Sequence, residues 1–149
     1  MNYKIKYVDL LYSVYASLKS SFKDSNVILN ESKSEVKGPL FFVQIKPLYS
    51  DSYKCYTKEL VNITITYTDV VLDQEKILTV KDELNELFDL GIKVNNVFLL
   101  FKNKKFSESD DCTILTLTID YFNNKSERNI PEEDKATKLM EKLIYKGVR

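Results

Sequence analysis

The sequence predicts an α+β domain in which two helices pack on one face of a mainly antiparallel sheet of four to five strands. Strict alternation of apolar and polar residues at 61–68 and 115–121 predicts two half-buried antiparallel strands. Apolar residues recur every three or four positions at 4–22 and at 77–88, which predicts two amphipathic helices. Because hairpins and helices alternate along the chain, both helices can cover the same face of one sheet.

The N-terminal part is predicted to run from a helix into strands. Residues 27–29 are a candidate for a short first strand, and residues 37–47, KGPLFFVQIKP, for the next. Pro39 suits the start of a strand and Pro47 its end, because proline donates no ladder hydrogen bond. We expect Phe41 to face the core and the tyrosine-rich segment 48–56 to be a loop. The predicted stripe of the first helix consists of Ile5, Val8, Leu11, Tyr12, Tyr15, Leu18 and Phe22.

The second half is predicted to contain a helix and two further strands. Gly91 suits the left-handed position that often follows a helix end. Residues 94–102 predict one strand, and the charged segment KNKKFSESDDC predicts the turn that joins it to the strand at 115–121. The predicted stripe of this helix consists of Ile77, Val80, Leu84, Leu87 and Phe88.

The chain is expected to divide into a domain at 1–122 and a linker with a C-terminal helical extension at 123–149. Pro131 suits the first turn of a helix, and residues 132–134 place three acidic groups at its positive end. Leu139, Met140, Leu143 and Ile144 form a small apolar stripe. This stripe either folds back onto its own domain or docks on a neighbour as a helix in a groove.

Composition excludes several functional classes. The 149 residues carry 22 basic and 22 acidic side chains, a net charge of zero, and no clustered positive face that would bind nucleic acid. No apolar run approaches the roughly 20 residues of a membrane-spanning helix. Asp9 interrupts the N-terminal region where a signal peptide would be apolar, so we expect an unexported protein with Cys55 and Cys112 as free thiols.

The sequence also predicts that the protein is not an enzyme and needs no cofactor or metal. Histidine is absent, which removes the commonest acid–base group at neutral pH and the usual transition-metal ligand. Adjacent acidic residues, at 82–83 and at 110–111, point in diverging directions and are expected to be solvated. No catalytic, cofactor-binding or metal-binding residue is therefore predicted.

Surfaces for binding other proteins are the remaining candidates. Tyr49, Tyr53 and Tyr56 lie close together, and tyrosine is enriched at interfaces because it combines a large area with a polar tip. Ordinary partial burial would explain them equally well. The threonine faces of the two alternating strands are either solvent-facing pleats or a subunit contact. The candidate interface residues are Tyr49, Tyr53, Tyr56, Leu139, Met140, Leu143 and Ile144.

The order of these segments resembles the tail terminator family of bacteriophages and phage-derived tail particles, in its low-GC Gram-positive branch. The N-terminal helix, the strand GPLFFVQI, the strand ELVNITITYTD, the helix around VKDELNELF and the strand DDCTILTLTIDYF carry the resemblance to about Phe122. Lys58 stands where related chains tend to have arginine. Asp110, Asp111 and Cys112 replace a frequent Asp-Gly turn.

The resemblance implies a ring, expected to be a homohexamer, that caps the head-proximal end of a tail tube and stops its polymerisation. Implied partners are further copies of the chain, the tail tube protein, and sheath and neck or collar proteins. The resemblance leaves open a contractile or a flexible tail, and an infectious phage or a headless tail-like particle (tailocin). We therefore expect assembly in the bacterial host cytoplasm, followed by incorporation into the particle.

Two other classes remain open at this point. One is another neck or tail-completion component, or the tail tube protein itself. The other is a small intracellular adaptor that binds a protein partner through its sheet edge.

Overall fold

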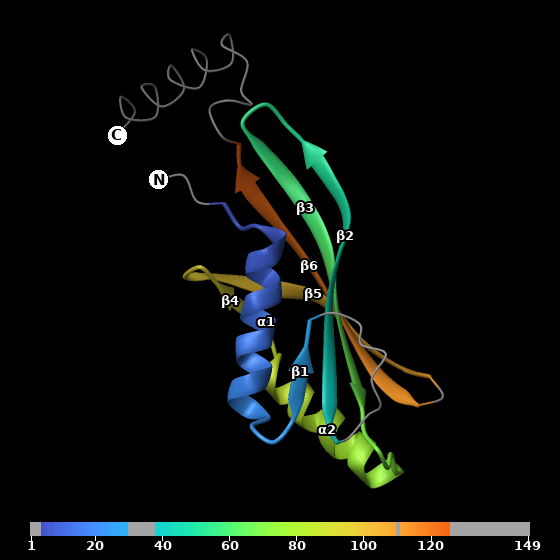
Figure 1. Ribbon diagram of the computed structural model, residues 1–149. Coiled ribbons are helices and arrows are strands. Elements are labelled where there is room, and N and C mark those ends of the chain that lie inside the picture. Colours follow the sequence, from blue (N-terminus) through green and yellow to red (C-terminus); the bar gives the residue numbers. More distant parts are fainter. Residues whose placement is uncertain (1–3, 30–37, 110, 126–149) are drawn as a thin grey trace.

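The computed structural model describes residues 4–29, 38–109 and 111–125. These residues form two helices and six strands in one curled, mixed sheet (Figure 1). In chain order the elements are α1 (Tyr7–Ser21), β1 (Asn26–Ile28), β2 (Leu40–Ser52), β3 (Tyr56–Thr68), α2 (Gln74–Leu87), β4 (Gly91–Val94), β5 (Val97–Ser109) and β6 (Cys112–Asn124). The α+β class is confirmed.

The sheet has the strand order β1-β2-β3-β6-β5-β4. β1 runs parallel to β2, and every other neighbouring pair is antiparallel. The prediction of four to five strands was too low, because residues 91–102 contain two strands where the sequence predicted one. The predicted C-terminal helix lies outside the described residues.

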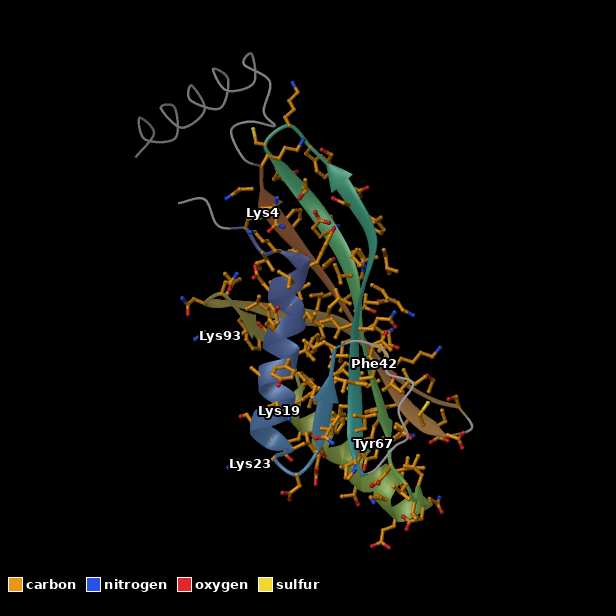
Figure 2. All side chains as sticks on the ribbon, in the orientation of Figure 1. Lys4, Lys19, Lys23, Phe42, Tyr67 and Lys93 are labelled. Carbon is orange, nitrogen blue, oxygen red and sulfur yellow. The ribbon has the colours of Figure 1, made fainter. Side chains whose placement is uncertain are left out.

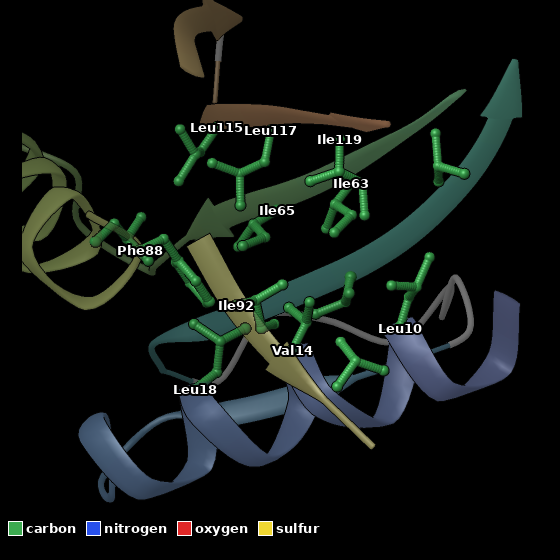
Figure 3. Packing of buried hydrophobic residues seen from close by; sticks show 14 of the residues in the cluster. Leu10, Val14, Leu18, Ile63, Ile65, Phe88, Ile92, Leu115, Leu117 and Ile119 are labelled. Carbon is green, nitrogen blue, oxygen red and sulfur yellow. The ribbon is translucent and has the colours of Figure 1, made fainter. Parts of the chain in front are cut away.

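The inner face of the sheet is the side whose residues join the hydrophobic core. The alternating strands were predicted correctly, because Val61, Ile63, Ile65 and Tyr67 of β3 are all buried, as are Leu115, Leu117, Ile119 and Tyr121 of β6. Their threonine neighbours lie half-buried on the opposite, outer face. Phe41 is fully buried, as predicted. Figure 3 shows Ile63, Ile65, Leu117 and Ile119 turned toward the same core as Val14 and Ile92.

Carboxylates mark where both helices begin. Asp9 accepts a hydrogen bond from the Lys6 backbone N–H at 2.9 Å, at the start of α1. Asp73 is the N-cap of α2 and accepts from the Lys76 backbone N–H at 2.8 Å. Each bond satisfies an N–H group that has no partner within its helix, and each negative charge lies at the positive helix end.

The two helices differ in how well the sequence predicted their buried sides. Val80, Leu84 and Phe88 are buried, which confirms the stripe of the second helix. The stripe predicted for the first helix was correct only in part. Ile5 and Leu18 are buried as predicted, and Leu11, Tyr15 and Phe22 are partly buried against the core. The other buried residues of the helix, Leu10 and Val14, were not predicted. Val8 and Tyr12 are exposed, because α1 is apolar on more than one side and periodicity alone does not choose between the sides.

The sequence predicted that β2 ends at Pro47, and this was wrong. The strand continues to Ser52 through a bulge. Pro47 lies opposite Val61, and Tyr49 lies opposite Leu60, so Leu48 is the additional residue. A bulge changes which residues face each side. Tyr49 therefore shares the outer face with Leu60. Proline is tolerated there because β1 pairs only with the first three residues of β2, which leaves the rest of that edge without a described partner strand.

Gly91 does not have the left-handed conformation that the sequence predicted, because no described glycine has a positive φ. It begins β4, where an added Cβ would overlap the backbone carbonyl oxygen of Leu99 on β5. The left-handed residues are Asn95 and Asn96, with φ of 49° and 66°. They form the two-residue turn between Val94 and Val97, as suits a tight hairpin.

Candidate functional site

The candidate site is a group of exposed aromatic rings at the end of the sheet where the β2–β3 hairpin turns. β6 ends beside this hairpin, and the β5–β6 turn lies at the opposite end of the molecule (Figure 1). The tyrosine-rich segment is therefore not a separate loop. Tyr49 belongs to β2, Tyr53 to the turn and Tyr56 to the first position of β3, and all three are exposed.

Three of these rings touch one another and form what we call the hairpin-end cluster: Tyr53, Tyr56 and Phe122. The Tyr53 and Tyr56 rings are stacked, with centroids 4.7 Å apart and an interplanar angle of 21°. Phe122 of β6 meets Tyr56 edge-on at 5.6 Å. The Lys58 Nζ lies 5.9 Å from the Phe122 ring centroid, within the range of a cation–π contact. Tyr49 takes no part in the ring contacts described for this part of the chain.

Phe122 was not among the predicted interface residues. It is 56% exposed although it lies in a regular strand. The signal was present in the sequence, because β6 ends in Tyr121-Phe122-Asn123 and successive residues of a strand point to opposite faces. With Tyr121 buried on the inner face, Phe122 had to point outward.

A buried carboxylate lies beneath the cluster, on the inner face. Glu59 is only 6% exposed and accepts three hydroxyl hydrogen bonds. Tyr7 of α1 donates at 2.7 Å, Ser50 of β2 at 2.8 Å and Thr57 of β3 at 3.0 Å. Bonds to an ionised acceptor are stronger than neutral ones. This network therefore fastens both strands of the hairpin to the first helix.

The Glu59 carboxylate also affects the ionisation of two tyrosines. The hydrogen bond that Tyr7 donates to Glu59, with burial and the negative charge of that group, raises the pKa of the Tyr7 phenol. Burial, followed by the charge of Glu59, raises the pKa of Tyr121, which pairs with Glu59 across the strands. Both phenols thus stay protonated to a higher pH than an ordinary tyrosine does.

A second surface is an apolar groove of about 570 Å³ between α1 and the edge of β2. Tyr7, Val8 and Leu11 form its helix side. Phe42, Ile45 and Pro47 form its strand side (Figure 2 labels Phe42). The sequence did not predict this groove, because the residues that line it come from elements about thirty residues apart.

The remaining predicted interface residues, Leu139, Met140, Leu143 and Ile144, lie outside the described residues and stay a prediction. Among the described residues, no group of His, Cys, Asp and Glu side chains is arranged to hold a metal ion. Cys55 and Cys112 are both free thiols. No helix within the described ranges is long and apolar enough to span a membrane.

The family comparison gives the most direct information on function. The model of the family described as phage tail terminator protein matches residues 9–131. This chain belongs to the phage tail terminator family. The match contains α2, all six strands and α1 from Asp9 onward, so the resemblance inferred from the sequence is confirmed. Its narrower placement in the low-GC branch stays a prediction. Membership in this structural family is consistent with a protein that is not an enzyme.

The other comparisons add little to the family assignment. A search of curated proteins finds no match for this tail terminator chain. One solved structure aligns with 82% of this chain and 98% of its own, at 10% identity and a TM-score of 0.40. That likeness is too distant to support an argument about fold or function.

Proposed function

We propose that this chain forms a closed homohexameric ring on the head-proximal end of a tail tube, where it stops tube growth and joins the tube to neck or collar proteins. Membership in the tail terminator family supports this role. The proposed partners are neighbouring copies, the tail tube protein, and sheath and neck proteins. Assembly takes place in the host cytoplasm, and the ring then becomes part of the particle.

The observation that carries the proposal beyond the family is the hairpin-end cluster. Tyr56 contacts both Tyr53 and Phe122, and all three rings remain exposed, on two paired strands and the tight turn beside them. Aromatic side chains are enriched in the centres of protein interfaces, where they bury a large area at a small entropic cost. The Glu59 network beneath them holds the hairpin in place, which lowers the cost of binding further.

A ring also requires that each subunit use two different surfaces. In a head-to-tail contact one patch meets a different patch of the next copy, and the series closes when the rotation closes. The hairpin-end cluster, on the outer face, is the first proposed patch. The apolar stripe predicted at Leu139, Met140, Leu143 and Ile144 is proposed for the other side of the subunit.

Truncation of Phe122 tests the cluster. A central aromatic residue typically contributes about 2 kcal/mol to an interface, so Phe122→Ala should weaken self-association roughly thirtyfold. Leu78→Ala is the matched control, because Leu78 is similarly exposed, at 51%, but lies on α2, away from the hairpin end. The measurement is native mass as a function of concentration, by sedimentation.

The expected result is a ring for the native chain and for Leu78→Ala, with a shift to monomers in Phe122→Ala. Circular dichroism spectra should be alike in all three proteins. Equal association of Phe122→Ala and the native chain would remove the cluster from the subunit contact. A native chain that stays monomeric and also fails to bind tube ends would contradict the ring itself.

A further inference from the structure

The helix α1 has two apolar sides, and the described part of the fold covers only one of them. Leu10, Val14 and Leu18 are fully buried against the sheet. Val8, by contrast, is 43% exposed, and Tyr12 is 58% exposed. A helix that is apolar on several sides is normally buried on several sides. The second side of α1 therefore indicates a surface that something else covers.

Strand β2, which lies next to this helix, also lacks a described partner strand along most of its outer edge. β1 pairs only with the segment from Leu40 to Phe42. From Val43 onward, no described strand pairs with that edge of β2. The groove lies between this edge and α1, and Val8, Leu11, Phe42 and Ile45 are among the residues that line it. Its lining is mostly apolar, which suits the apolar side of one amphipathic segment.

We propose that residues 132–149 of a second copy of this chain occupy the groove as an amphipathic helix. The sequence of that segment places Leu139, Met140, Leu143 and Ile144 at helical spacing, which gives a stripe about two turns long. Helices that insert into grooves use anchors with this spacing. The inference rests on the proposed ring and names the contact that closes it.

Charge complementarity sets the direction of the inserted helix. Lys6 precedes α1, and Lys46 stands beside Pro47 at the same end of the groove, and both are exposed. Residues 132–134 of the incoming segment are Glu-Glu-Asp. The acidic first turn thus lies beside the two lysines, and the apolar stripe points along the groove toward Leu29, which is also part of the lining.

The geometry of the chain favours a segment from a neighbour over the segment of the same chain. Tyr56 lies opposite Asn124, and Val61 lies opposite Pro47, so the groove begins five residues along β3 from the end of β6, about 17 Å away. β6 and β2 are also two strand spacings apart, about 10 Å.

The straight path from the end of β6 at Asn124 to the groove is therefore about 20 Å, and the chain from Asn124 to residue 132 reaches about 27 Å when fully extended. The β6 strand also ends pointing away from the groove. A chain that had to reverse its direction would use most of the remaining length of about 7 Å, which disfavours insertion into its own groove.

Thiol cross-linking between two variants tests the inference directly. Both variants carry Cys55→Ser and Cys112→Ser, which remove the natural thiols. One adds Val8→Cys in the groove, and the other adds Leu143→Cys in the C-terminal segment. The two proteins are mixed at the concentration at which the native chain assembles and are then oxidised. The expected principal product is a covalent dimer containing one copy of each variant.

The control replaces Val8→Cys with Leu78→Cys, which places an equally accessible thiol on α2. Dimer yield from the control mixture should stay at the level of random collisions. No dimer above this level in the test mixture would overturn the inference. A single chain carrying both Val8→Cys and Leu143→Cys that links only within itself, as a fast-migrating monomer, would also overturn it and would assign the groove to the chain's own segment.

A charged residue placed in the groove tests this contact separately from the proposed function of the ring. Val8→Glu should weaken self-association roughly a hundredfold, because a carboxylate pressed into an apolar contact loses its water without gaining a partner. Leu78→Glu should leave it unchanged. If Val8→Glu still forms rings and caps tubes, the groove inference fails while the proposed function stands. If the native chain neither self-associates nor binds tube ends, the proposed function fails.

Discussion

Removing the Tyr7 hydroxyl tests whether the Glu59 network fastens the β2–β3 hairpin to α1. Tyr7→Phe deletes the hydroxyl that donates a 2.7 Å hydrogen bond to Glu59. Glu59 stays buried, and Ser50 and Thr57 are its two remaining described donors. The phenyl ring keeps its place at the start of α1 and at the groove. The substitution therefore removes little other than this hydrogen bond.

The expected loss follows from the type of bond and from its exposure. Hydrogen bonds to charged groups contribute about 1.5–3 kcal/mol to stability. Tyr7 is partly exposed, so water can replace part of the lost bond, and we expect a value near the lower limit, about 1.5 kcal/mol. Tyr12→Phe removes a hydroxyl from a more exposed ring of the same helix and should change stability by less than about 0.5 kcal/mol.

Urea unfolding followed by circular dichroism measures these differences. Repeating Tyr7→Phe in a Glu59→Gln background completes a double-mutant cycle, which isolates the interaction between the two side chains. We expect a coupling of about 1 kcal/mol, because the amide accepts a weaker hydrogen bond than the carboxylate. A coupling near zero, or a Tyr7→Phe protein as stable as the native chain, would refute the role of this network.

Three further predictions concern the fold that supports the site. Phe41→Ala should lower the free energy of unfolding by about 3–5 kcal/mol in a urea titration, because Phe41 is fully buried; a loss below about 1 kcal/mol would contradict that burial. Gly91→Ala should cost about 2 kcal/mol or more and speed hydrogen exchange in β4, because its Cβ would overlap the Leu99 carbonyl oxygen; unchanged exchange would contradict the close approach. Burial and the Asp69 carboxylate raise the pKa of Tyr67 to about 12. Because the folded state holds this proton more tightly, the contribution of Tyr67 to stability is complete below about pH 10 and is lost as the pH rises toward 12. Tyr67→Phe should reduce this alkaline loss, and an identical pH profile would contradict the assignment.

The parts of the fold that the sequence predicted are those in which local pattern and tertiary packing agree. The alternation in β3 and β6 is strict, and each strand has one face on the core, so a shift by one residue would bury threonine in place of isoleucine. The stripe of α2 was equally clear, because its remaining sides are polar apart from Leu78. α1 has apolar residues around most of its circumference, so its orientation depends on which side the sheet covers.

Local sequence signals are weaker where backbone detail decides the structure. The Asn95-Asn96 pair is suited to a tight hairpin, but the apolar residues on both sides of it looked like one continuous strand. The bulge after Pro47 turns Tyr49 to the outer face, and proline by itself predicts only a strand end or an edge.

The hairpin-end cluster was predicted in part for a similar reason. Two of its three rings are close in sequence, whereas Phe122 joins them only because β6 pairs with β3. That pairing is a property of the sheet order, which local patterns do not contain. The groove depends on the sheet order in the same way.

Imaging of labelled protein on purified tail tubes tests the central claim, that this family member caps one end of a tube as a ring. The native chain, carrying a gold label on an added tag, is incubated with tubes and viewed by electron microscopy. We predict a single label cluster at one end of each tube and no lengthening of capped tubes when tube protein is added. Label along the tube length, at both ends equally, or on tubes that continue to grow from the labelled end would contradict the claim.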